Sequence, residues 1–306
     1  MQMKFKAHQT FAIRKGWLGK GLRGIQKVDR TLLMPSSSRK AMDELGLGSN
    51  QVVALRYWLE TTGLIERVKR SHEHCLTEMG QLIFEHDPYT EEIGTLWALH
   101  CNLASAQGAA SSWYFFFNEF KMAGAFDKET FTRALERYIF TYSDKPKVAL
   151  TSLDADFSCI LNTYMPHDRS DNRQASPESV IDCPLCELGL IGVDNRSAKT
   201  YRKKPANLST LPGSLILYAI CPSRRQLKNG KNGVGKEAKL ETLLDGPCMP
   251  GRVYNLDSVA LLTKLYELEN NGKLRINRTA GLDVARFTNP DMTKEDCLAD
   301  YYRMIG

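Results

Sequence analysis

The chain has 306 residues, which is long enough for two or three domains that each bury a core. Hydrophobic residues make up 42% and charged residues 25% of the chain, which excludes wholesale disorder. No stretch approaches the roughly 20 apolar residues of a membrane span, and residues 1–11 lack the apolar segment of a secretory signal. We therefore expect a cytoplasmic protein with no membrane partner.

The net charge of +6 is unevenly distributed. Residues 1–70 carry fourteen Lys and Arg against five acids, and residues 196–240 carry eleven against one, which gives net charges of +9 and +10. Residues 81–130 carry two against seven, a net charge of −5. Two basic regions that flank an acidic one favour a surface facing a polyanion. Solvated loops are the alternative interpretation of each basic region taken alone.

An N-terminal arm over residues 1–37 alternates aromatic and cationic side chains. Such a segment can pack on a core and still present charge to phosphates. The arm contributes Arg14, Lys15 and Lys20 as candidate DNA contacts.

Residues 38–86 predict a winged helix-turn-helix. Ser38 can cap a helix over residues 39–45, and glycines at 46 and 48 predict a tight turn. Ser49 or Asn50 can cap a second helix that ends near residue 62. Strands over 64–68 and 75–77 then enclose a polar tip, and a further helix begins at 78. Helix, turn, helix and hairpin follow one another as in winged-helix proteins.

The second helix of this unit predicts a buried face with Val52, Leu55 and Leu59, and an outer face with Asn50 and Val53. Asn pairs with adenine, Val contacts thymine methyl groups and Tyr can reach phosphate. A winged helix used only for protein contacts is the alternative. The candidate DNA-binding residues of this unit are Asn50, Gln51, Val53, Arg56, Tyr57, Arg67, Lys69 and Arg70.

The rest of the chain divides into a helical domain over 87–165, a polar linker over 166–180 and a C-terminal α+β domain over 181–306. The aromatic residues between 97 and 131 favour a packed core. A helix over 256–270 precedes strands over 273–276 and 279–282, and its residues expected to face inward are Val259, Leu262, Leu265 and Tyr266. We expect a mainly α fold with small β-hairpins (α+β), in which winged-helix units are joined by a helical middle region.

Residues 230–237 match most of a phosphate-loop pattern, but Glu237 stands where the magnesium-binding hydroxyl is required. The segment instead predicts a basic loop for nucleic-acid backbone, with Lys228, Lys231 and Lys236 as candidates. Cys183 and Cys186 form a lone CxxC motif, and zinc is not favoured because a structural site needs four ligands.

Metal-dependent DNA cleavage requires clustered carboxylates, since magnesium is held by oxygen. The candidate catalytic residues are Asp154, Asp156, Asp182 and Glu187. Asp154 and Asp156 point about 200° apart on one helix, which makes them poor joint ligands. Capping or surface carboxylates are the alternative, and the metal site itself is unknown.

The opening His8-x-Thr10-Phe11-x-x-Arg14-x-Gly16-Trp17-Leu18 resembles that of a bacterial family of unknown function, domain of unknown function four-thousand-and-seven. Further motifs of the resemblance are Arg56-Tyr57-Trp58, Leu76-Thr77-x-x-Gly80, Trp113-Tyr114-x-Phe116-Phe117-Asn118 and Pro250-Gly251-Arg252-Val253. Members are encoded beside DNA phosphorothioation and phage-defence genes. The resemblance implies double-stranded DNA as substrate and a cysteine desulfurase, an ATP-pyrophosphatase-like sulfurtransferase and an ATPase as partners.

The resemblance extends to the nickase-like DNA-binding component of single-strand phosphorothioation. It implies that a relative of this kind nicks one strand, with Mg²⁺ or another divalent cation as cofactor, so that sulfur can enter the backbone. Two alternatives stay open, a non-enzymatic DNA-binding adaptor and a transcriptional regulator of the operon. A regulator would bind a palindromic site as a stable dimer.

Overall fold

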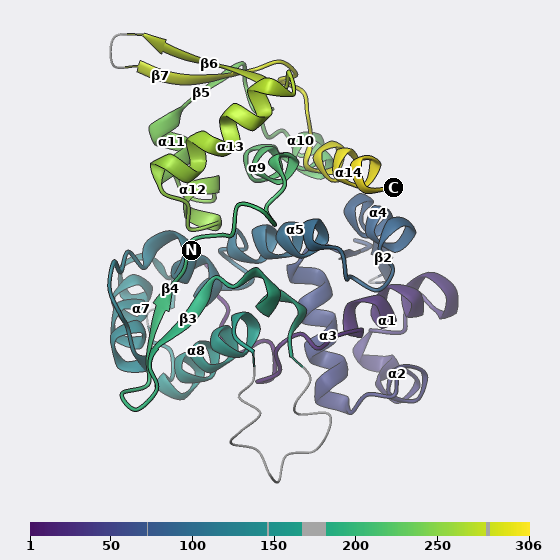
Figure 1. The fold of residues 1–306 in the computed structure, drawn as a ribbon. Coiled ribbons are helices and arrows are strands. Elements are labelled where there is room, and N and C mark those ends of the chain that lie inside the picture. The colour runs from purple at the N-terminus through teal and green to yellow at the C-terminus, as the bar shows by residue number, and fades with distance from the viewer. Residues whose placement is uncertain (72, 146, 167–181, 280–281) are drawn as a thin grey trace.

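The computed structural model describes residues 1–71, 73–145, 147–166, 182–279 and 282–306. The expected linker over 166–180 lies outside these ranges except for Pro166. Helices predominate, and small antiparallel sheets lie beside them, so the α+β class is confirmed (Figure 1). No helix in the described ranges is both long and apolar enough to cross a membrane.

The first region carries the predicted order of helix, turn, helix, hairpin and helix. Gly46 ends the first of these helices with a φ of 63°, and the next helix begins three residues later. Both helices begin at the expected serines, Ser38 and Ser49, but neither serine caps its helix, because the N-cap positions are Ser37 and Gly48 and neither makes a side-chain cap hydrogen bond. The elements are α1 (Trp17–Arg23), η1 (Gly24–Val28), η2 (Pro35–Ser37), α2 (Ser38–Leu45), α3 (Ser49–Thr61), β1 (Ile65–Arg67), β2 (His74–Leu76) and α4 (Glu78–His86).

Close packing of α4 on β1 accounts for one of the glycines of the family motifs. A Cβ on Gly80 would lie 2.0 Å from the carbonyl oxygen of Leu64, so no larger residue fits there without movement of the backbone. Thr77 begins α4 by accepting a hydrogen bond from the Gly80 N–H at 3.0 Å. The Leu76-Thr77-x-x-Gly80 motif therefore joins the hairpin to the next helix.

The middle region is an aromatic core, as predicted. Trp97, Trp113, Phe116 and Phe131 are each at most 1% exposed, and several of the rings pack edge to face. Asp127 caps a helix by accepting a hydrogen bond from the Thr130 N–H. The elements are α5 (Ile93–Ala104), α6 (Ser111–Tyr114), η3 (Phe115–Glu119), α7 (Lys128–Tyr142) and α8 (Leu150–Tyr164).

The C-terminal region holds two sheets. One is a hairpin beside α8, and the other is three-stranded, antiparallel and ordered β5-β7-β6 (Figure 1). The elements are η5 (Pro184–Leu188), β3 (Ile191–Asn195), β4 (Thr200–Lys203), α9 (Gly213–Ile220), α10 (Arg224–Lys228), β5 (Glu237–Lys239), α11 (Leu240–Asp245), α12 (Pro250–Val253), α13 (Ser258–Asn270), β6 (Leu274–Thr279), β7 (Leu282–Phe287) and α14 (Lys294–Ile305).

Two expectations for this region were wrong. The composition of residues 224–239, rich in Gly, Lys and Asn, predicts a loop, but α10 opens this stretch and β5 pairs with β7 at its end. Val259 and Tyr266 do not face inward on α13, since they are 71% and 41% exposed. Leu265 is buried, as predicted, but Leu261 and Leu268 complete the buried side, so the helix is rotated from the expected orientation.

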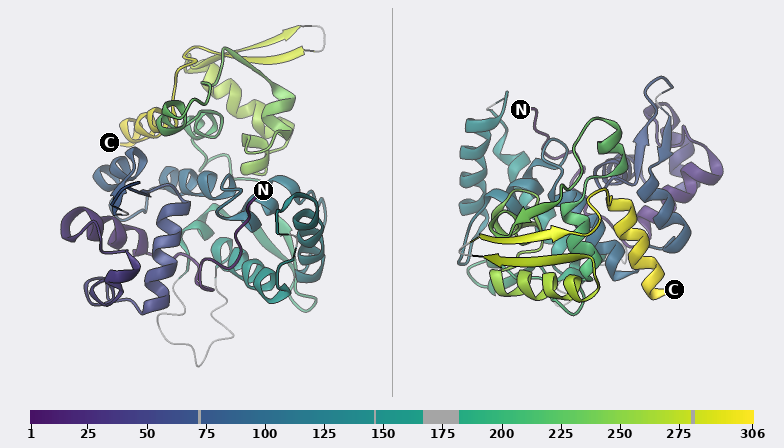
Figure 2. Two further views of the ribbon diagram at one scale, coloured as in Figure 1. Left: turned by 180° about the vertical axis from the view of Figure 1, so that it is seen from behind. Right: turned by 90° about the horizontal axis from the view of Figure 1, so that it is seen from above.

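The C-terminal region also contacts the first region directly. α14 packs against α4, α5 and α9, and seen from behind it lies beside α4 in Figure 2. The two basic parts of the sequence are therefore parts of one folded body, although residues 71–195 separate them in the chain.

Candidate nucleic-acid interface

The expected reading helix, α3, turns most of its length inward. Val52, Leu55 and Leu59 are buried, as predicted, but Trp58 is also fully buried, and its ring NH donates to the Phe11 carbonyl at 2.9 Å. The arm thus lies across one side of the helix. Only its first turn is open, where Asn50 is exposed.

Two of the predicted contacts on α3 are directed at the protein itself. The Tyr57 hydroxyl donates to the Ala109 carbonyl at 3.1 Å, and burial raises its pKa far above the ordinary value. The Arg56 guanidinium donates to the Leu33 carbonyl at 3.0 Å. Both side chains are half-buried and, in this conformation, are directed at the protein rather than outward. Val53 is also half-buried, and Gln51 accepts the Gly48 N–H at 2.9 Å.

Cations of the arm are likewise engaged with the rest of the chain. Arg14 lies over the rings of Phe11 and Trp17, with centroid distances of 5.6 and 5.4 Å. Lys15 pairs with Glu91 at 2.9 Å, and Lys20 donates to the Leu45 carbonyl at 3.3 Å. These three cations of the arm therefore all contact other groups of the protein.

A buried carboxylate fixes this arm to α8. Asp156 is 1% exposed and accepts hydrogen bonds from the Lys6 N–H at 2.8 Å, from His8 Nε2 at 2.8 Å and from the Ser112 hydroxyl at 2.6 Å. His8 Nδ1 accepts the Thr10 N–H at 3.1 Å, so this hydrogen-bond network requires a neutral imidazole with its proton on Nε2. His8 also stacks on Trp58 with the ring centroids 5.9 Å apart. The first residue of the family's opening motif is therefore a packing residue.

The four candidate catalytic carboxylates do not form one site. Asp154 and Asp156 project from opposite sides of α8, as their spacing predicted, and Asp154 lies 3.5 Å from the Lys128 ammonium at the surface. Glu187 is exposed on η5, where its charge helps raise the pKa of Lys15 after the larger effect of Glu91. Asp182 is half-buried next to the CxxC segment. In that segment burial raises the pKa of the Cys186 thiol to about 11.

The wing tip and the lysine-rich loop leave neighbouring elements. Arg225 on α10 pairs with Glu66 on β1 at 2.6 Å, and Lys228 pairs with Glu78 on α4 at 3.2 Å. The chain runs from β1 to the tip and from α10 to the loop, so both basic segments extend from elements in contact. The arm is in contact with the wing as well, since the His74 N–H of β2 donates to the Arg30 carbonyl at 2.9 Å.

Ion pairs within the protein also determine which cations of the wing tip and the lysine-rich loop lack an acidic partner. Arg67 pairs with Glu60 at 2.8 Å, and Lys228 with Glu78, so two predicted contacts already have acidic partners. No acidic group of the described residues lies within ion-pair distance of the other four predicted cations of these segments, which are all exposed: Lys69, Arg70, Lys231 and Lys236.

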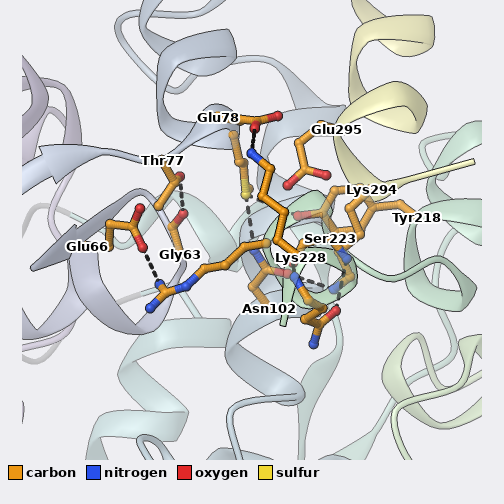
Figure 3. A pocket seen from close by; sticks show the side chains of 13 residues that line it. Gly63, Glu66, Thr77, Glu78, Asn102, Tyr218, Ser223, Lys228, Lys294 and Glu295 are labelled. Carbon is orange, nitrogen blue, oxygen red and sulfur yellow. Dashed lines mark hydrogen bonds and ion pairs between the residues drawn. The ribbon is translucent and has the colours of Figure 1, made fainter. Parts of the chain in front are cut away.

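A cavity of about 300 Å³ lies where the two regions meet (Figure 3). The Lys294 ammonium lies 4.7 Å from the centroid of the Tyr218 ring and donates to the Asn102 side-chain oxygen at 2.9 Å. Acidic and basic side chains alternate around the wall, and Figure 3 shows Glu66 and Glu78 directed at cations from α10. The two regions therefore meet at this cavity through ion pairs between oppositely charged side chains.

Several residues of this junction were not singled out from the sequence. Arg224 pairs with Glu78 at 2.9 Å and with Asp296 at 2.5 Å, so it connects α10 to both α4 and α14. The basic run 224–228 was a detectable signal for a charged element. Nothing in the sequence indicated Glu66, Glu78 or Asp296 as its partners, because they lie far away along the chain.

The comparisons with known proteins agree with the motifs and extend them to the fold. The family model described as "Protein of unknown function (DUF4007)" matches residues 5–302. The chain belongs to this family. No curated protein matches the chain.

Two solved structures resemble the chain over nearly its whole length. A magnesium ion-bound SspB crystal structure is 25% identical, with a TM-score of 0.81, and the match covers 98% of this chain and 88% of that chain. A second SspB crystal structure is 24% identical, with the same TM-score and coverage, and supports the fold alone.

One of these SspB structures is magnesium ion-bound, so we compared the carboxylates of this chain with the requirements of a magnesium site. Within the described ranges, no three or more His, Cys, Asp or Glu side chains gather as a metal site would require. All three hydrogen bonds of Asp156 come from protein donors, and Asp154 pairs with a lysine. The four predicted carboxylates therefore do not fit a common magnesium site in this conformation.

Proposed function

We propose that this chain is the DNA-engaging component of a bacterial DNA phosphorothioation or phage-defence system. The observation that carries the proposal is the full-length likeness to SspB, together with membership of a family whose motifs resemble proteins encoded beside phosphorothioation genes. The proposed partners are double-stranded DNA and the desulfurase, sulfurtransferase and ATPase of the same system.

Two units of the fold support DNA engagement. We assign α2, α3 and the β1–β2 hairpin to one winged-helix unit, and β5, α11 to α13 and the β6–β7 hairpin to a second. The β5-β7-β6 sheet packed on a helix that precedes its hairpin favours that assignment for the second unit. Four exposed cations without acidic partners among the described residues, at 69, 70, 231 and 236, suit phosphate contacts.

Loss of these cations is expected to weaken DNA binding for every sequence alike. In fluorescence anisotropy with a labelled duplex, Lys69→Gln with Arg70→Gln should lower the slope of log K against log salt by roughly two units. The pair Lys231→Gln and Lys236→Gln should do the same. Lys128→Gln with Arg133→Gln is the matched control, because both cations are exposed on α7 and pair with acids. An unchanged slope in both test variants would assign those loops to solvent or to protein.

Strand nicking is a second candidate function, which the magnesium-bound SspB likeness favours. It predicts relaxed circles when supercoiled plasmid is incubated with the chain and Mg²⁺, and none in the presence of a chelator. If supercoiled plasmid stays intact at micromolar protein, with the proposed partners added, the nickase candidate is removed. The DNA-binding adaptor, whose affinity still falls steeply with salt, then remains.

A further inference from the structure

One side of α13 is uncovered at the far end of the molecule. The helix packs against α9, α12 and β6 through its leucine side. Val259, Thr263, Tyr266 and Asn270 all lie exposed on the other side. Their spacing of four, three and four residues places them in a single stripe along the helix.

The side chains of this stripe are of kinds that can contact base edges in DNA. None of its members is charged, although charged residues flank it. The Thr263 hydroxyl donates to the Val259 carbonyl at 2.8 Å, so its methyl group is the part left for contact. Methyl groups of Val and Thr contact thymine, and Asn can bind adenine through two hydrogen bonds. Glu267, the nearest exposed acid on the helix, pairs with Lys264 at 2.7 Å.

Positive charge lies beside the stripe, on the β6–β7 hairpin. The Arg278 guanidinium lies 5.8 Å from the centroid of the Tyr266 ring. Arg275 and Arg286 are directly opposite in the β6–β7 register, an arrangement that costs stability when no anion compensates it. Glu237 compensates Arg286 at 3.2 Å, whereas Arg275 has no acidic partner in the described part of the chain. A polyanion at the hairpin would relieve that repulsion.

We propose that α13 is the helix that enters the major groove of duplex DNA, and that the β6–β7 hairpin contacts the adjacent backbone. This inference rests on the proposed function and gives it a specific site. The comparison with α3 supports it, since α3 directs Tyr57 and Arg56 at its own protein while α13 has an open face. Figures 1 and 2 show the strands of the hairpin at the edge of the molecule, beside α13.

The test is Val259→Glu, with Val193→Glu as its matched control. Val259 is 71% exposed on α13 and Val193 is 43% exposed on β3, so each substitution adds the same carboxylate to an open surface. Thermal unfolding of the two variants should match the original chain within a few degrees. In duplex-binding anisotropy, Val259→Glu should weaken affinity at least about tenfold, because its carboxylate meets phosphates and base edges. Val193→Glu should leave affinity unchanged.

A second variant tests the hairpin without adding negative charge. Arg278→Gln should lower the salt slope by about one unit while Val193→Glu leaves it unchanged. Val259→Glu binding as tightly as the unmodified chain, or Val193→Glu losing as much, would overturn the assignment of α13. If the unmodified chain binds DNA and only the Lys69/Arg70 variant loses affinity, the first unit makes the contact. If the unmodified chain binds no DNA, the proposed function is overturned together with this inference.

Discussion

Asp156→Ala is expected to destabilise the protein by about 3–5 kcal/mol, since it removes the acceptor of a buried charged network. The donors from Lys6, His8 and Ser112 would lose their acceptor, and the His8 and Ser112 donors are buried. The loss should appear as a lower midpoint in urea unfolding with an unchanged slope. His8→Ala should cost a similar amount, and the two losses should not add, because they break the same contact.

Asp154→Ala is the control for this experiment, two residues away on the same helix. Its carboxylate is 40% exposed and makes a surface ion pair with Lys128, and such pairs contribute at most about 1 kcal/mol. A structural Asp156 therefore predicts a large loss of stability in one variant and little in the other. Equal stability of both, with loss of plasmid nicking in Asp156→Ala alone, would restore Asp156 as a catalytic carboxylate.

His100 is expected to make the fold sensitive to mild acid. Burial lowers its pKa to about 4, and the neutral ring is held by the Tyr164 hydroxyl at 2.8 Å and the Val253 carbonyl at 2.8 Å. The unfolded chain binds this proton near pH 6.5, so stability present above that pH is lost as the pH falls toward 4. The whole window amounts to about 3 kcal/mol, of which about 2 kcal/mol is lost by pH 5.

Urea unfolding at several pH values measures this effect. Carboxylates titrate in the same range, so the quantity to compare is the difference between the original chain and His100→Gln, which has no titrating ring. The original chain should lose about 2 kcal/mol more than His100→Gln between pH 7 and pH 5. His86→Gln is the control, because His86 is exposed at the end of α4. Parallel pH profiles for His100→Gln and the original chain would contradict a buried neutral His100.

Local signals in the sequence were sufficient to predict much of the fold. Glycine turns, capping residues and alternating apolar residues predicted α2, α3 and the β1–β2 hairpin, and the aromatic run predicted the buried middle region. These features depend on neighbours within a few residues, and backbone geometry limits such neighbours to few arrangements. The β3–β4 hairpin was missed, since its strands carry mostly exposed residues and so have little apolar pattern.

The candidate site depended on contacts that local pattern does not contain. The periodicity of α3 correctly placed Val52, Leu55 and Leu59 inward, but it could not show that the arm and Ala109 would cover the other side. The rotation of α13 was also mispredicted. Apolar residues occur on more than one side of this helix, so periodicity did not show that Leu261, Leu265 and Leu268 are buried while Tyr266 is exposed.

The sequence by itself determined the class of fold, the family motifs and the regions that carry excess positive charge. Only the tertiary structure decided which cations are matched by acids, because Glu66, Glu78 and Glu91 come from other parts of the chain. The surroundings of Asp156 also depend on the tertiary structure, because its donors Lys6 and Ser112 lie 150 and 44 residues away in the chain. Whether a side chain is buried, and whether its charge is compensated, depends on which residues lie near it in space. Residues that are neighbours in space can be far apart in the sequence, so local sequence patterns do not show these contacts.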